Sequence, residues 1–200
     1  MENEGITDLS ADPELLRREC IRFNVFHQSK SNSVKILEYV RRLIFKQSTD
    51  VNEAFESYLR NSLHWTTFSV KIFMNNKSLN IYDGKIINQV CDTAERIGKW
   101  IETKIRKNHE TKAIVKVLCI WLKIHTFLKK ADVDDNYPAE IVQFEAWVKE
   151  LYKCGKDIFL TKNGSNDVGD GETFYMHVLR YYMPQIARDT YERFKCGVGI

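Results

Sequence analysis

The sequence predicts an all-α fold: a bundle of about seven to nine helices in one domain spanning residues 1–200. Three observations support this class. The chain has only three prolines and nine glycines, so tight turns are few and long helices are favoured over many short strands. Hydrophobic residues make up 44% and charged residues 28%, which is ordinary for a chain that buries a core. Apolar residues also recur at the helical period through most of the sequence.

The first quarter of the chain predicts helices separated by a polar break. Asp12, followed by a proline, is typical of a helix start, and this helix is expected to end near residue 28. The polar stretch SKSNS then predicts a break, and Ser33 is expected to cap a second helix that ends near residue 47. A third helix is expected from Asp50, where a capping-box pattern begins.

Residues 64–84 leave two structures open. From Phe68 to Met74 apolar residues alternate with polar ones, which is typical of strands and predicts one small β-hairpin near residues 66–83. The same residues, together with Trp65, fit a helix equally well. We favour the helix, because two strands alone are only marginally stable in water.

The helical period is strongest after Gly84. One long helix is expected to continue to about Ile105, followed by a break over 107–110. The next helix, over 114–128, is apolar on a broad surface. This pattern predicts that it occupies a central position in the bundle.

The C-terminal part predicts three further helices and one loop. Pro138 and Gly155 are expected to begin and end a helix. Residues 161–171 are polar and glycine-rich, which predicts a flexible loop. The last two helices are expected over 172–182 and 185–195, divided by a proline.

Cysteine spacing and the N-terminal composition indicate an intracellular protein, nuclear or cytoplasmic. The five cysteines are widely spaced and form no CxxC pair, so free thiols are expected. The start MENEGITDLSADPE has neither the basic nor the apolar stretch of an export signal. No apolar stretch approaches the roughly 20 residues that cross a bilayer, so we expect no membrane contact.

No cofactor motif is present in the sequence, and we predict no metal site. The stretch DVDDN at 132–136 has the alternating oxygen ligands of a calcium loop. Its sixth position is Tyr137, where a sharp turn needs glycine, and its twelfth is Gln143, where calcium needs a bidentate glutamate. The five histidines form no HxH or HxxxH pair.

Charge is unevenly distributed along the chain. Residues 96–130 contain ten Lys or Arg against two Glu, a balance of +8, whereas 131–172 contain four Lys against ten acids, a balance of −6. The basic segment predicts contact with the phosphates of duplex nucleic acid. The residues expected to make this contact are Lys99, Lys104, Arg106, Lys107 and Lys112. The alternative is that these cations cover solvent-facing helix surfaces or pair with the acidic segment.

Two other function classes stay open. A helical module that binds a protein partner is suggested by the apolar residues around Trp121 and Trp147. An enzyme is suggested by Glu172, His177 and Tyr181, which could supply a general acid and base if they converged in a cleft.

The closing segment GETFYMHVLRYYMPQIARDTYERFKCGVGI resembles a stretch of transposon-derived proteins of invertebrates, in which a helix of the form HxLxxxxP precedes a glycine-rich return. The residues that carry the resemblance are His177, Leu179, Tyr181, Pro184, Gly197 and Gly199. The resemblance implies an all-helical insertion within an RNase H-like transposase, with the last catalytic acid expected after Ile200. It therefore implies a nucleic-acid-associated helical fragment that is not catalytic by itself.

Overall fold

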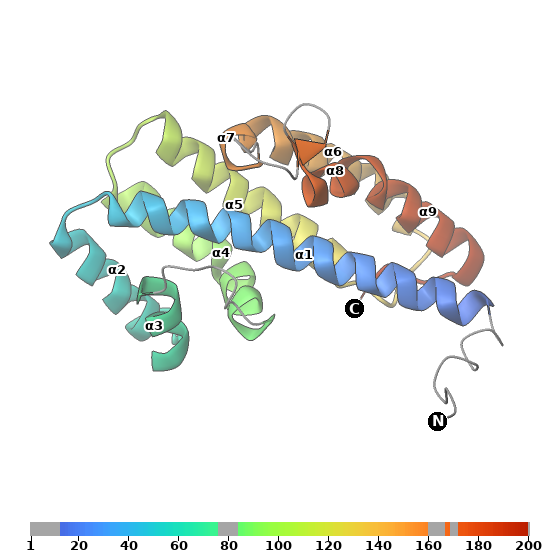
Figure 1. Cartoon of the computed structure of the whole chain (residues 1–200), viewed down its shortest axis with the longest axis horizontal. Helices are drawn as coiled ribbons and strands as arrows, with labels where there is room; N and C mark the ends of the chain where they lie inside the picture. The colour runs from blue at the N-terminus through green and yellow to red at the C-terminus, as the bar shows by residue number, and fades with distance from the viewer. Residues whose placement is uncertain (1–12, 76–83, 160–166, 169–171, 200) are drawn as a thin grey trace, which may run out of the picture.

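The structure is a computed structural model that describes residues 13–75, 84–159, 167–168 and 172–199 (Figure 1). Within these residues the chain forms nine helices and one pair of two-residue strands. The helices are α1 (Pro13–Phe45), α2 (Thr49–Asn61), α3 (Thr67–Asn75), α4 (Gly84–Lys104), α5 (His109–Leu128), α6 (Tyr137–Cys154), α7 (Lys156–Phe159), α8 (Phe174–Tyr181) and α9 (Met183–Phe194). The all-α class and the expected number of helices are confirmed.

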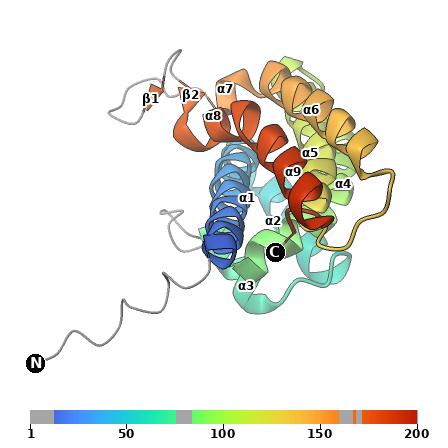
Figure 2. The ribbon, with the colours of Figure 1, turned by 90° about the vertical axis from the view of Figure 1, so that its right-hand side faces the viewer.

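Helix α5 lies at the centre of the bundle, as its broad apolar surface predicts. It packs against α4, α6 and α1 (Figure 2). Half of its residues are buried, because three neighbouring helices cover most of its circumference. The Phe127 ring stacks on the rings of Phe144 and Tyr137, with centroid distances of 4.3 and 5.3 Å, and so joins α5 to α6.

Helix α1 is continuous through the polar stretch at 29–33, so the expected break there is wrong. Ser29, Asn32 and Ser33 are all buried, with exposed fractions of 6% or less. Ser29 and Ser33 are four residues apart and therefore lie on one face of the helix. This face contacts α4 and α5, and the serines are interior side chains of a long helix.

The serines on α1 belong to a buried polar seam that we define as Ser29, Ser33, Cys91, Trp121 and His125. The Trp121 indole Nε1–H donates to Ser33 Oγ at 3.0 Å, and Ser33 Oγ lies 3.5 Å from Cys91 Sγ. Ser29 Oγ lies 2.9 Å from His125 Nδ1. Because buried polar groups need hydrogen-bond partners, these contacts fix the register of α1 against α4 and α5.

The β-hairpin considered near residues 66–83 is absent over Thr67–Asn75, which forms α3. The rest of that range lies outside the described residues. Val70 and Phe73 are fully buried and three residues apart, which is the spacing of a helix face and not of a strand. The burial of this face against the core is what favours the helix over the hairpin here.

The polar loop expected over 161–171 lies mostly outside the described residues. Within it, Asp167–Val168 (β1) pairs in antiparallel fashion with Glu172–Thr173 (β2). The helix expected from residue 172 therefore begins two residues later, at Phe174.

The segment after α9 docks on the connection between α5 and α6. The Gly197 N–H donates to the Ala131 carbonyl at 2.8 Å, and the Gly199 N–H donates to the Lys130 carbonyl at 2.6 Å. Val198 between the two glycines is buried. A Cβ atom on Gly197 would lie 2.2 Å from the Lys130 carbonyl oxygen. Only glycine allows the two backbones to approach this closely.

Replacing Gly197 by alanine is expected to lower the free energy of unfolding by about 2 kcal/mol, because the backbone of the segment must move away. Gly98 is the matched control, since a Cβ there meets Val115 Cγ1 at an ordinary 3.6 Å. In the middle of α4, Gly98→Ala is expected to raise stability by about 0.5–1 kcal/mol. Urea unfolding of both variants measures the two values, and equal effects would contradict the close approach.

Candidate nucleic-acid interface

The connection between α4 and α5 is anchored by a buried side chain and by hydrogen bonds at the start of α5. Ile105 within it is buried, which anchors the connection to the core. The Asn108 side chain caps α5 by accepting a hydrogen bond from the Thr111 N–H at 2.7 Å. The Thr111 hydroxyl also lies 3.0 Å from the Arg106 carbonyl, to which it can donate. The side chains on this connection therefore extend from a fixed turn.

Four cations on and beside this connection are exposed, and we call them the basic turn: Lys104, Arg106, Lys107 and Lys112. Among the residues that the structure describes, none of the four makes an ion pair. Lys104 is the last residue of α4, and Lys112 lies in the first turn of α5. The chain takes five residue steps from Lys104 at the end of α4 to His109 at the start of α5 and so spans at most about 18 Å, which gathers these charges at one end of the bundle (Figure 1).

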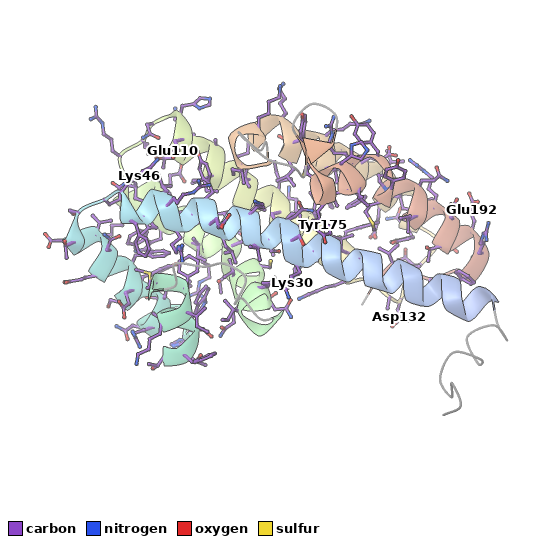
Figure 3. All side chains as sticks on the ribbon, in the orientation of Figure 1. Lys30, Lys46, Glu110, Asp132, Tyr175 and Glu192 are labelled. Atoms are coloured by element: carbon purple, nitrogen blue, oxygen red, sulfur yellow. The ribbon has the colours of Figure 1, made fainter. Side chains whose placement is uncertain are left out.

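One of the two carboxylates beside the basic turn is neutralised by α1. Glu102 and Glu110 are the acids among residues 102–112. Lys46, which follows α1, places its Nζ 3.1 Å from Glu110 Oε1 (Figure 3). Of these two acids, Glu102 is the one without an ion pair among the described residues.

Lys99 differs from the other four residues that the sequence singles out. Its Nζ lies 2.8 Å from Glu95 Oε1, one helical turn earlier on α4. The hydrogen bond and the charge of Glu95 raise the pKa of Lys99 above its ordinary value. Lys99 is exposed but paired, so we leave it outside the basic turn.

The remaining cations of residues 96–130 contact groups within the protein. Lys116 Nζ lies 2.6 Å from Glu150 Oε1, and Lys130 Nζ lies 2.6 Å from Glu140 Oε1, so two lysines pair with the acidic segment. Lys129 lies 3.8 Å from Asp92, Lys123 lies over the Trp147 ring, and Arg96 donates to the Ser62 carbonyl. Pairing with the acidic segment therefore holds for Lys116 and Lys130, and the other three cations contact different groups of the chain.

The apolar surface expected around Trp121 and Trp147 is largely used by the fold. Trp121 is 1% exposed and belongs to the buried polar seam. Trp147 is half-buried, and the Lys123 Nζ lies 5.7 Å from its ring centroid. Trp121 therefore leaves no open surface for a partner helix.

The three residues suggested for an enzyme are only partly described. His177 and Tyr181 lie one helical turn apart on α8, with ring centroids 4.7 Å apart. Tyr181 is 56% exposed, whereas His177 is half-buried. The backbone of Glu172 lies in β2, and its side chain is outside the described residues.

The buried polar seam contains two titratable groups with shifted pKa values. Burial, together with a smaller effect of the nearby charge of Lys129, lowers the pKa of His125 to about 4. Burial raises the pKa of the Cys91 thiol to about 11. Both groups are neutral near pH 7, and within the described residues no three metal-ligating side chains gather at one point. The buried polar seam therefore contributes to the packing of α1, α4 and α5.

The sequence singled out Tyr181 but missed the exposed tyrosine pair that it forms at the junction of α8 and α9. Tyr181 and the following Tyr182 are both more than half exposed, and Arg180 lies between the rings of Tyr152 and Tyr181. The signal was the YY pair directly before Met183 and Pro184, at a helix junction.

Comparison with known proteins assigns no family. No family model matches this chain, and no curated protein or solved structure does. Among the described residues no helix is both long and apolar enough to cross a membrane.

Proposed function

We propose that this chain binds duplex nucleic acid non-specifically, with Lys104, Arg106, Lys107 and Lys112 contacting phosphates. The observation that carries the proposal is the contrast within the basic segment. Lys99 and the cations on either side of the basic turn are engaged by other groups of the chain, whereas the four cations of the basic turn are exposed without an ion pair among the described residues. Unpaired lysine and arginine side chains are the groups that neutralise phosphates and release counterions.

The position of the basic turn supports phosphate contact over base reading. The two tryptophans of the basic segment, Trp100 and Trp121, are buried, so no tryptophan of this segment is available to stack on bases. The first backbone N–H groups of α5 add partial positive charge at the same end. Contacts of this kind position a protein on a duplex without selecting a sequence.

The resemblance of the C-terminal segment to transposon-derived proteins also implies a nucleic-acid role. In this proposal the chain is a helical region of such a protein, and it supplies binding rather than catalysis.

A salt titration of binding to a labelled duplex tests the proposal. Four phosphate contacts predict that log K falls with log salt at a slope of about −3.6, so affinity drops roughly 100-fold between about 50 and 200 mM salt. Two duplexes of unrelated sequence are expected to bind equally. Absence of binding at low salt, or affinity that is indifferent to salt, would contradict the proposal.

A further inference from the structure

Aromatic rings that are missing from the basic turn gather on another surface, made by α8 and the end of α6. We call this surface the tyrosine cluster and define it by Tyr152, His177, Arg180, Tyr181 and Tyr182. Arg180 Cζ lies 3.6 Å from the Tyr152 ring centroid and 4.7 Å from the Tyr181 centroid. The His177 ring lies 4.7 Å from the Tyr181 ring and 5.9 Å from the Tyr182 ring. Four rings and one guanidinium therefore form a contiguous set.

Two rings of the tyrosine cluster face solvent. Tyr181 is 56% exposed and Tyr182 is 54% exposed. Phe45 and Phe68 are the other strongly exposed aromatic residues in the described part of the chain, and they lie apart on different helices. The tyrosines thus differ from scattered surface rings, which are normal in globular proteins.

Cations accompany these rings. Besides Arg180, the Lys156 Nζ lies 6.0 Å from the Tyr152 ring centroid, and Lys153 is exposed on the last turn of α6. Glu145, a carboxylate of α6 that faces α9, is already paired with Arg188. Cations beside exposed rings are complementary to a chain of phosphates that carries unstacked bases.

We propose that the tyrosine cluster binds single-stranded nucleic acid. Unpaired bases stack on Tyr181 and Tyr182, while Arg180 and Lys156 attract the phosphates. The Tyr152 ring holds the guanidinium of Arg180 beside the Tyr181 ring, so the platform is partly ordered before binding. This site is separate from the basic turn and does not depend on the duplex binding proposed above.

The experiment compares a short labelled oligothymidine with an abasic oligomer of equal length, at about 200 mM salt, where phosphate contacts are weakened. The native chain is expected to bind oligothymidine at least about tenfold more tightly than the abasic oligomer, because each stacked base contributes 1–3 kcal/mol by alanine substitution, about 5- to 150-fold. The double variant Tyr181→Ala, Tyr182→Ala is expected to bind both oligomers equally.

Two controls separate stacking from other effects. The variant Tyr181→Phe, Tyr182→Phe keeps the rings and is expected to retain the preference for bases. Phe68→Ala removes a ring that is 64% exposed on α3 and is expected to leave the preference unchanged. A native chain that does not distinguish the two oligomers, or an alanine variant that still does, overturns the proposal. If the double alanine variant loses the preference for bases but still binds duplex as the native chain does, the result supports the tyrosine cluster and does not bear on the basic turn.

Discussion

Replacing all four cations of the basic turn by glutamine is expected to weaken duplex binding by at least about 100-fold at about 50 mM salt. Each substitution removes one phosphate contact, and with it the release of about 0.9 counterions. The four side chains are exposed and make no ion pair within the described residues, so the variant is expected to unfold at an unchanged urea concentration. Fluorescence anisotropy with a labelled duplex measures the change.

A matched variant removes the same number of charges elsewhere. It carries glutamine at the exposed cations Lys71, Lys129, Arg193 and Lys195. Lys71 lies on α3, Lys129 directly follows α5, and the other two lie at the end of α9, so none belongs to the α4–α5 connection. Net charge is identical in the two variants, so a similar loss of affinity in both would mean that overall charge, and not the basic turn, attracts the duplex.

Lowering the pH from 7 to 4 is expected to remove about 3 kcal/mol of folding free energy through His125 alone. Burial lowers the pKa of this histidine from about 6.5 to about 4. Between these values the unfolded chain binds a proton that the folded chain excludes, so stability falls as the pH falls. The contribution is fully present above pH 6.5 and is lost near pH 4.

Urea unfolding across this pH range measures the effect as a difference between variants, because carboxylates titrate in the same range. His125→Asn does not titrate and keeps a polar atom toward Ser29, so its stability is expected to decline less on acidification. His109 is exposed at the start of α5, and His109→Gln is expected to follow the native curve. Parallel curves for the native chain and His125→Asn would contradict the burial of a neutral histidine.

Helix periodicity predicted those parts of the fold that have one clearly apolar face. The residues of α4, α5 and α6 repeat at the helical spacing, and local signals set their ends. Pro138 lies in the first turn of α6, Gly155 follows its last turn, and Pro184 lies in the first turn of α9. These signals act within a few residues of the chain, so they can be read without knowledge of packing.

The continuity of α1 could not be predicted in the same way. Ser29 and Ser33 favour a break locally, because serine side chains compete for backbone hydrogen bonds. Their partners Trp121 and His125 lie about ninety residues away and satisfy the hydroxyls inside the core. The four-residue spacing of the two serines was the sequence signal for a continuous helix. This signal can be interpreted only once α5 is known to pack beside α1.

The balance of charges along the sequence located the basic segment, but it did not show which of its cations make no ion pair. The balance of +8 over residues 96–130 treats all ten cations alike. Lys116 and Lys130 lose their availability because α6 lies beside α5 and brings Glu150 and Glu140 to them. Ion pairing between helices depends on tertiary contacts, which the sequence alone does not give. The sequence therefore predicted a basic segment of 35 residues, whereas the structure narrows the unpaired cations to the basic turn.

The most direct test of phosphate contact by the basic turn is the salt slope of duplex binding, measured one cation at a time. Lys107→Gln and Lys112→Gln are each expected to reduce the magnitude of the slope by about 0.9, from about 3.6 to about 2.7. Arg193→Gln, at an exposed cation near the end of α9, is expected to leave the slope unchanged. Slopes that are the same for all three variants and the native chain would contradict the account.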